Sequence, residues 1–259
     1  MKKLPTILLT NDDGIYAEGL LKLWEMLVEA ADVVVVAPEL EKSASSHSIT
    51  LNEPIRVTRV QKENGFNGYA VRGTPVDCIK VAARSILDKM PDLFISGINH
   101  GPNTGISVLY SGTVGAALEG GSMGVTSMAV SINKFRNPDF TGALVYTKKI
   151  IDGLFKEPLP KGTVLSVNVP ACSINEIQGI RVTHQGQSRF AEVFDCRVDP
   201  RKNEYCWLGG GMVEMEEDES ADYVALRNGY VSVTPLHVDL TDYKSLARLR
   251  ELEKSVRID

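Results

Sequence analysis

The chain has 259 residues, of which 43% are hydrophobic and 24% are charged, with a formal net charge of −5. This apolar content excludes a disordered chain, and the length is enough to bury a core without disulfide or metal staples. Binding to a nucleic acid polymer needs a cationic surface, which the charge balance disfavours. No apolar run approaches the roughly 20 residues that span a bilayer. The N-terminal run, interrupted by Pro5, is too short for a signal peptide, so we expect a cytoplasmic protein without a membrane partner.

The first half alternates short β-branched runs with helical patterns. Apolar runs predict buried strands at residues 4–10, 33–37, 93–95 and 127–132, and helical spacing predicts helices at 20–27, 75–89 and 113–119. Four consecutive valines within 33–37 suit a central strand that is covered on both faces. Strands that alternate with helices imply right-handed crossover units, so the predicted fold is α/β with a mainly parallel sheet.

The alternation of strand and helix patterns ends at about Pro170. Residues 189–222 are rich in charge and contain three consecutive glycines, which favours extended hairpins and loops outside the sheet. A strand is predicted at 230–234 and an amphipathic helix at 241–253. We therefore predict one domain over 1–259, with an α/β core at 1–170 and a β-rich region at 171–259.

The cysteines are Cys78, Cys172, Cys196 and Cys206, and they form no Cys-x-x-Cys pair. Reduced, mostly buried thiols are expected, with neither a disulfide framework nor a zinc site.

Polar side chains follow three of the predicted strands, in segments 11–14, 42–47 and 96–103. Because ligands bind beyond the carboxyl ends of parallel strands, these segments are expected to line one crevice. Two adjacent carboxylates, Asp12 and Asp13, repel each other unless a cation neutralises them. Magnesium or manganese prefers oxygen ligands, which Asn99 and a serine hydroxyl would complete. The strand-end argument does not choose among Ser43, Ser45 and Ser46, and the alternative interpretation of 12–14 is a simple turn and helix cap.

A second polar segment, residues 110–115, opens a predicted helix. Its hydroxyls and free backbone amides suit an anion such as phosphate. The alternative is N-capping by Ser111 or Thr113. An anion site beside an acidic metal site indicates phosphate chemistry. His47 and His100 flank this region, either as proton donors to a leaving alkoxide or as structural residues.

Taken together, these motifs resemble the SurE family of survival-protein phosphatases. The resembling stretches occur in family order over nearly the whole chain: 7–14 (Ile-Leu-Leu-Thr-Asn-Asp-Asp-Gly), 35–38 with Ser43, 73–78, 96–99 with Gly101 and Asn103, 110–117, 168–170, 199–201 and 229–236. The resemblance implies a three-layer Rossmann-like fold with a protruding β-hairpin and a C-terminal arm exchanged between subunits of a homodimer or homotetramer.

The resemblance also implies a divalent-metal-dependent phosphohydrolase, a 5′-nucleotidase, acting on nucleoside 5′-monophosphates and also on 3′-nucleotides and short polyphosphate. One Mg²⁺ or Mn²⁺ per subunit would be bound by the ligand set Asp12, Asp13, Ser43 and Asn99. Catalytic roles are expected for Asp12, Asp13 and Asn11, and substrate contacts for Asn103, Ser111, Gly112 and Thr113. Attack on phosphorus by metal-activated water is the expected route, with a phosphoaspartate intermediate as the alternative.

Two departures from the family pattern are visible. Ala44 stands where the family has glycine after the metal-binding serine, which narrows the backbone conformations of this loop. Residues 201–207 also differ, in the predicted hairpin region, which bears on assembly and substrate preference. Two rival functions remain open: a non-catalytic nucleotide sensor, and a nucleotide-sugar or NAD-binding enzyme, although Gly-x-Gly-x-x-Gly is absent after the first strand.

Overall fold

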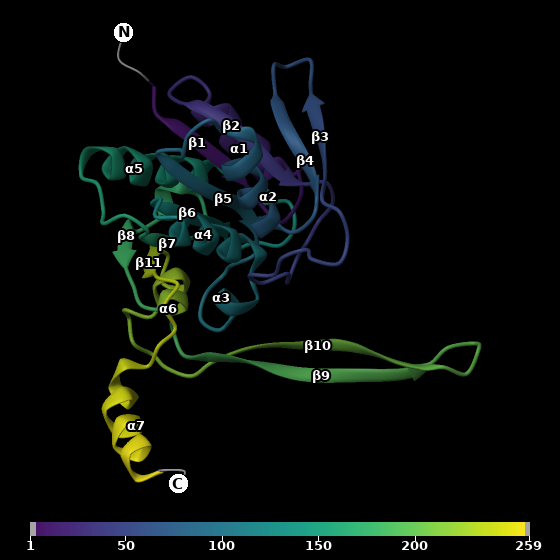
Figure 1. The fold of residues 1–259 in the computed structure, drawn as a ribbon, viewed down its shortest axis with the longest axis vertical. Helices are drawn as coiled ribbons and strands as arrows, with labels where there is room; N and C mark the ends of the chain where they lie inside the picture. Colours follow the sequence, from purple (N-terminus) through teal and green to yellow (C-terminus); the bar gives the residue numbers. More distant parts are fainter. Residues whose placement is uncertain (1–3, 257–259) are drawn as a thin grey trace.

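The computed structural model describes residues 4–256. Within them, nine strands form one sheet in the order β3-β4-β2-β1-β5-β6-β7-β11-β8 (Figure 1). The strands are β1 (Thr6–Thr10), β2 (Asp32–Pro38), β3 (Arg56–Gln61), β4 (Asn67–Arg72), β5 (Leu93–His100), β6 (Ser127–Ile132), β7 (Val164–Val169), β8 (Ile180–Val182) and β11 (Val231–Leu236). Pairing is parallel from β4 through β7, and β3 and β11 are antiparallel to their neighbours β4 and β7. The predicted α/β class with a mainly parallel sheet is confirmed.

Helices cover both faces of the sheet, which gives three layers. One core cluster packs α1 (Glu18–Leu27) and α5 (Thr141–Lys156) on one face, and a second packs α2 (Pro75–Val81) on the other. Helix α4 (Gly112–Ser122) joins α2 through Ala116. Successive residues of β1 alternate between the two clusters, as a strand buried on both faces requires: Ile7 and Leu9 face one, Leu8 the other.

The predicted elements of the first half are present, with one helix shorter than expected. The helix predicted at 75–89 continues from α2 as a π-helical turn, Ala82–Ile86, and stops where Leu87 becomes extended. The hairpin β3–β4, helix α5 and strand β7 were not predicted. The remaining helices are α3 (Ser107–Tyr110), α6 (Asp222–Arg227), α7 (Tyr243–Ser255) and a 3₁₀ turn (Ile174–Glu176). No helix within 4–256 is long and apolar enough to cross a membrane.

A long hairpin projects from the body of the molecule, as Figure 1 shows. It consists of β9 (Ser188–Val198) and β10 (Glu204–Glu214), which form a separate two-stranded sheet with mostly exposed residues. The expected hairpin outside the main sheet is thus confirmed. Strands β8 and β11 nevertheless lie in the main sheet, so the region 171–259 also completes the core, and the boundary at 170 stays a prediction.

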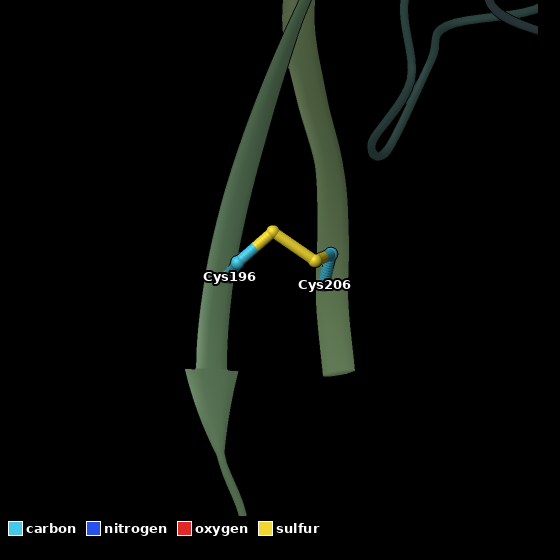
Figure 2. Close-up of a disulfide and its surroundings, with 2 residues drawn as sticks. All are labelled: Cys196 and Cys206. Carbon is cyan, nitrogen blue, oxygen red and sulfur yellow. A yellow bond between two sulfur atoms is a disulfide. The ribbon is translucent and has the colours of Figure 1, made fainter. Parts of the chain in front are cut away.

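The expectation of four reduced cysteines is wrong for one pair. Cys196 and Cys206 form a disulfide across the hairpin (Figure 2). Antiparallel register places the two residues directly opposite each other, with their Cα atoms 4.0 Å apart. The sequence separation of 10 residues matches no motif that would have revealed this pairing. Cys78 and Cys172 are free thiols, and only Cys78 is buried.

Candidate functional site

The candidate site lies where β1, β2 and β5 end side by side. Parallel pairing sets Thr10 next to Ser96 and Leu9 next to Val35, so the segments that follow these strands emerge at one edge. The register of β5 against β6 shifts between Ser96 and Asn99. Within this irregularity Gly97 has φ +141°, and a Cβ there would lie 2.4 Å from the Val130 carbonyl oxygen. Only glycine fits this position, from which β5 continues to Asn99.

The turn after β1 is closed by Asn11. Its side-chain amide donates to the Gly14 carbonyl (2.9 Å), and its Oδ1 accepts from the Gly14 amide (3.1 Å). Asn11 is fully buried, and both polar atoms of its side chain serve the turn that presents Asp12 and Asp13. This geometry favours positioning of the carboxylates by Asn11.

Within residues 4–256, no positively charged side chain lowers the pKa of either carboxylate of this turn. Asp12 is 4% exposed, and its Oδ1 accepts a hydrogen bond from the Thr113 hydroxyl. Burial raises the pKa of Asp12 to about 6, and the charge of Asp13 adds to the rise. Burial likewise raises the pKa of Asp13 to about 6, although a hydrogen bond from the His100 backbone lowers it in part. Asp13 Oδ2 is buried without a hydrogen-bond partner among the described residues. A bound cation would satisfy that oxygen and offset the cost of burying two charges.

The loop after β2 brings serine hydroxyls to the same edge. Ser43 is exposed, and its hydroxyl donates to Glu41 Oε1 (2.6 Å). Ser45 Oγ is buried and has no partner within residues 4–256. A Cβ at Gly112 would lie 2.5 Å from Ser45 Oγ and 3.0 Å from Asp12 Cβ, so Ser45 and Asp12 flank Gly112. Ser45 is thus closely packed at the site. The sequence argument from strand ends had not distinguished Ser45 from Ser43 and Ser46.

Ala44 adopts φ +56°, a region that favours glycine. A left-handed backbone costs a residue with a Cβ roughly 1–2 kcal/mol. We therefore expect Ala44→Gly to raise the free energy of unfolding by up to about 1 kcal/mol, since glycine's larger unfolded entropy offsets part of the gain. Urea denaturation of the metal-free protein measures this. A loss of stability would contradict the assigned strain.

Asn99 and the start of α4 complete the edge. The Asn99 amide nitrogen donates to the carbonyls of Gly101 (2.8 Å) and His100 (3.3 Å), while its Oδ1 accepts no hydrogen bond from residues 4–256. Ser111 is the N-cap of α4, since its hydroxyl accepts from the Val114 amide (3.1 Å). The side chain of Ser111 therefore serves as the helix N-cap, as the alternative interpretation of this segment expected. The hydroxyl of Thr113 instead donates to Asp12.

Of three further candidates, Asn103 and His47 have polar partners, whereas His100 packs on an aromatic ring. Asn103 is buried, with its side-chain amide on Ser131 Oγ (2.8 Å) and its backbone amide on Asn168 Oδ1 (2.8 Å). His47 Nε2 lies 2.8 Å from Glu119 Oε2. The His100 ring packs on Phe140 at a centroid distance of 5.6 Å, and its buried Nε2 has no partner in the described part of the chain.

Within residues 4–256, no three His, Cys, Asp or Glu side chains gather in a way that could hold a metal ion. The candidate set has two carboxylates, and its other members, Ser43 and Asn99, are neutral oxygen donors. Such donors suit Mg²⁺ or Mn²⁺, which keep several water ligands, better than zinc. The orphaned Asp13 oxygen and the free Asn99 carbonyl oxygen fit a cation of this kind.

Comparison with known proteins gives a consistent result. The family model described as "Survival protein SurE" matches residues 7–192. A "5′-nucleotidase SurE" of Syntrophus aciditrophicus (strain SB) is 47% identical over 246 residues, which cover 95% of this chain and 92% of that protein. One of Syntrophobacter fumaroxidans is 45% identical over 243 residues, covering 94% and 97%. The crystal structure of the SurE protein from Aquifex aeolicus superposes with a TM-score of 0.83 at 40% identity, over 96% of this chain and 100% of that one.

Proposed function

The chain belongs to the SurE family, and on that premise we propose that it is a 5′-nucleotidase that removes phosphate from nucleoside 5′-monophosphates. The observation that supports this most is the pair of carboxylates after β1, one buried and one half-buried, beside the N-terminus of α4. One of them keeps a buried, unpartnered oxygen among the described residues. An acidic pair next to a polar helix start combines a cation site with a place for phosphate oxygens.

Asp12, Asp13, Ser43 and Asn99 are the residues proposed to hold a divalent ion, Mg²⁺ or Mn²⁺. When bound, such an ion polarises a phosphoryl group and lowers the pKa of a water ligand. Ser43 would exchange its hydrogen bond to Glu41 for this role. Thr113 keeps Asp12 oriented through its hydroxyl, and Asn11 keeps both carboxylates in place through Gly14.

The start of α4 is proposed to bind the substrate phosphate. Helix α4 has 11 residues, so its free amides and dipole favour an anion near Ser111, Gly112 and Thr113. Gly112 lies against Asp12 and Ser45, with no room for a side chain, which leaves its backbone close to both. Asn103, through its bonds to Ser131 and Asn168, would shape the neighbouring loop and orient substrate.

We also propose that the hairpin takes part in a homodimer or homotetramer with exchanged C-terminal elements. Its exposed apolar side chains include Phe194, Trp207 and Leu208, and α7 buries none of its residues in the single chain. Exposed apolar side chains that gather on one element are typical of protein interfaces. The cytoplasmic location stays a prediction from the sequence.

The test is phosphate release from nucleoside 5′- and 3′-monophosphates and short polyphosphate, with EDTA, Mg²⁺ or Mn²⁺. We expect release from 5′-monophosphates that EDTA abolishes and added metal restores. If folded protein binds nucleotide and metal but releases no phosphate, it is a sensor and the proposal is wrong. Release that is unaffected by EDTA would remove the metal from the proposed chemistry.

A further inference from the structure

The 42–47 loop follows β2 in the chain, packs against α4, and is attached to the protein at both ends. At its start, the Lys42 amide donates to the Asp12 carbonyl (2.7 Å). Near its end, the Ser46 amide donates to the Tyr110 carbonyl (3.0 Å), and the Ser46 hydroxyl to the Leu109 carbonyl (2.7 Å). Ser43 and Ser45 lie between these attachments.

The loop rests directly on one face of α4. A Cβ at Gly115 would lie 2.4 Å from the Ser46 carbonyl oxygen, and one at Gly112 would lie 2.5 Å from Ser45 Oγ. Residues three and four apart share a helix face, so Gly112, Gly115 and Glu119 form one row along α4. Two glycines leave room for the loop, and the third position of the row is a carboxylate.

Glu119 joins three segments of the chain. Its side chain is only 9% exposed, and its two oxygens lie 2.8 Å from His47 Nε2 in the loop and 2.5 Å from Lys80 Nζ in α2. The hydrogen bond with His47, followed by that from Lys80, holds the pKa of Glu119 below its usual range. The buried carboxylate is therefore paired on both oxygens, and His47 is engaged by it.

We propose that Glu119, with His47 and Lys80, is a latch that holds the 42–47 loop on α4, and that it thereby keeps the Ser45 hydroxyl beside Asp12 and fixes the segment that carries Ser43. These three are positioning residues, acting through the serines. The segment needs such support because Ala44 and Ser46 both have positive φ, 56° and 53°, which their side chains disfavour. The inference rests on the proposed metal-dependent function and gives His47 a role other than proton donor.

The test compares His47→Ala with His47→Gln, whose side-chain amide keeps an N–H donor for Glu119. His47 is 39% exposed, so neither change is expected to unfold the protein. Mn²⁺ binding is measured by the electron paramagnetic resonance signal of free Mn²⁺, which needs no turnover. Hydrogen exchange of peptides over 42–48 reports the loop directly. Asp152→Ala, which breaks the exposed Lys148–Asp152 pair on α5, is the matched control.

We expect His47→Ala to raise the dissociation constant for Mn²⁺ about tenfold, the usual cost of losing a group that orients a metal ligand. Exchange over 42–48 should accelerate, while the nucleotide KM at saturating Mn²⁺ changes less than about twofold. His47→Gln should restore most of the affinity, and Glu119→Ala should reproduce the loss. Faster exchange with unchanged Mn²⁺ affinity would overturn the proposal, as would a His47→Gln variant as weak as His47→Ala. A wild-type protein that binds Mn²⁺ but releases no phosphate would refute the proposed function and leave the latch supported by its own readouts.

Discussion

Asp13→Asn is expected to lower kcat/KM for metal-dependent phosphate release by about 1000-fold or more, and Asp12→Asn by a similar factor. Each change removes a charged oxygen ligand from a site with only two carboxylates, and the electrostatic stabilisation supplied by a bound cation is several kcal/mol. Phosphate release and Mn²⁺ binding are measured together. Asp92→Asn is the matched control, because Asp92 lies at the opposite end of β1, where its carboxylate accepts from the Thr6 amide (2.8 Å).

The substitutions that are expected to abolish activity should increase the stability of the metal-free protein. The pKa of each carboxyl in the folded state is about 6, above the ordinary value of 3.8, so the folded protein binds these protons more tightly than the unfolded chain. Metal-free wild-type protein should therefore gain stability as the pH falls from 7 through 6 toward 4, by up to about 3 kcal/mol per group. Asp13→Asn should flatten this dependence and unfold at a higher temperature than metal-free wild type at pH 7. In the phosphate-release assay, near-wild-type turnover of both Asp12→Asn and Asp13→Asn would contradict the assignment of the site.

Gly19→Ala is expected to destabilise the fold by about 1–3 kcal/mol, the usual cost of overpacking. A Cβ at Gly19 would lie 2.2 Å from the Ile98 carbonyl oxygen and 3.2 Å from the Phe140 ring, so α1 or β5 must shift. Because Ile98 precedes Asn99, we expect the metal affinity to fall as well. Chemical denaturation measures the first effect and Mn²⁺ titration the second.

Gly153→Ala is the matched control for this prediction. Gly153 lies near the end of α5 and is exposed. A Cβ at this position would have open space around it, with no neighbouring group within 4 Å. Alanine there should raise the free energy of unfolding by about 0.5–1 kcal/mol, since it loses less backbone entropy than glycine. If Gly19→Ala and Gly153→Ala changed the free energy of unfolding in the same direction, the close contact of α1 with β5 would not explain the effect of Gly19→Ala.

Local patterns in the sequence were sufficient for four strands of the parallel part of the sheet, β1, β2, β5 and β6, but not for β4 and β7. The valine run of β2 and the apolar runs of β1, β5 and β6 report burial on both faces, which depends on a few consecutive residues. The position of Asp12, Asp13 and Asn99 also came from the sequence, because parallel strands end at a common edge and residues after them must meet there. Periodicity does not state strand order, so the insertion of β11 between β7 and β8 was visible only in the structure.

The sequence by itself determined the α/β class and the acidic edge at which the carboxylates meet, because those features depend on short apolar runs and on the polar residues directly after them. The tertiary structure decided which groups face each other across long separations. Thr113 reaches Asp12 from 101 positions away, and His47 reaches Glu119 from 72. Contacts of this kind depend on how helices and loops pack on the finished sheet, which no local propensity encodes.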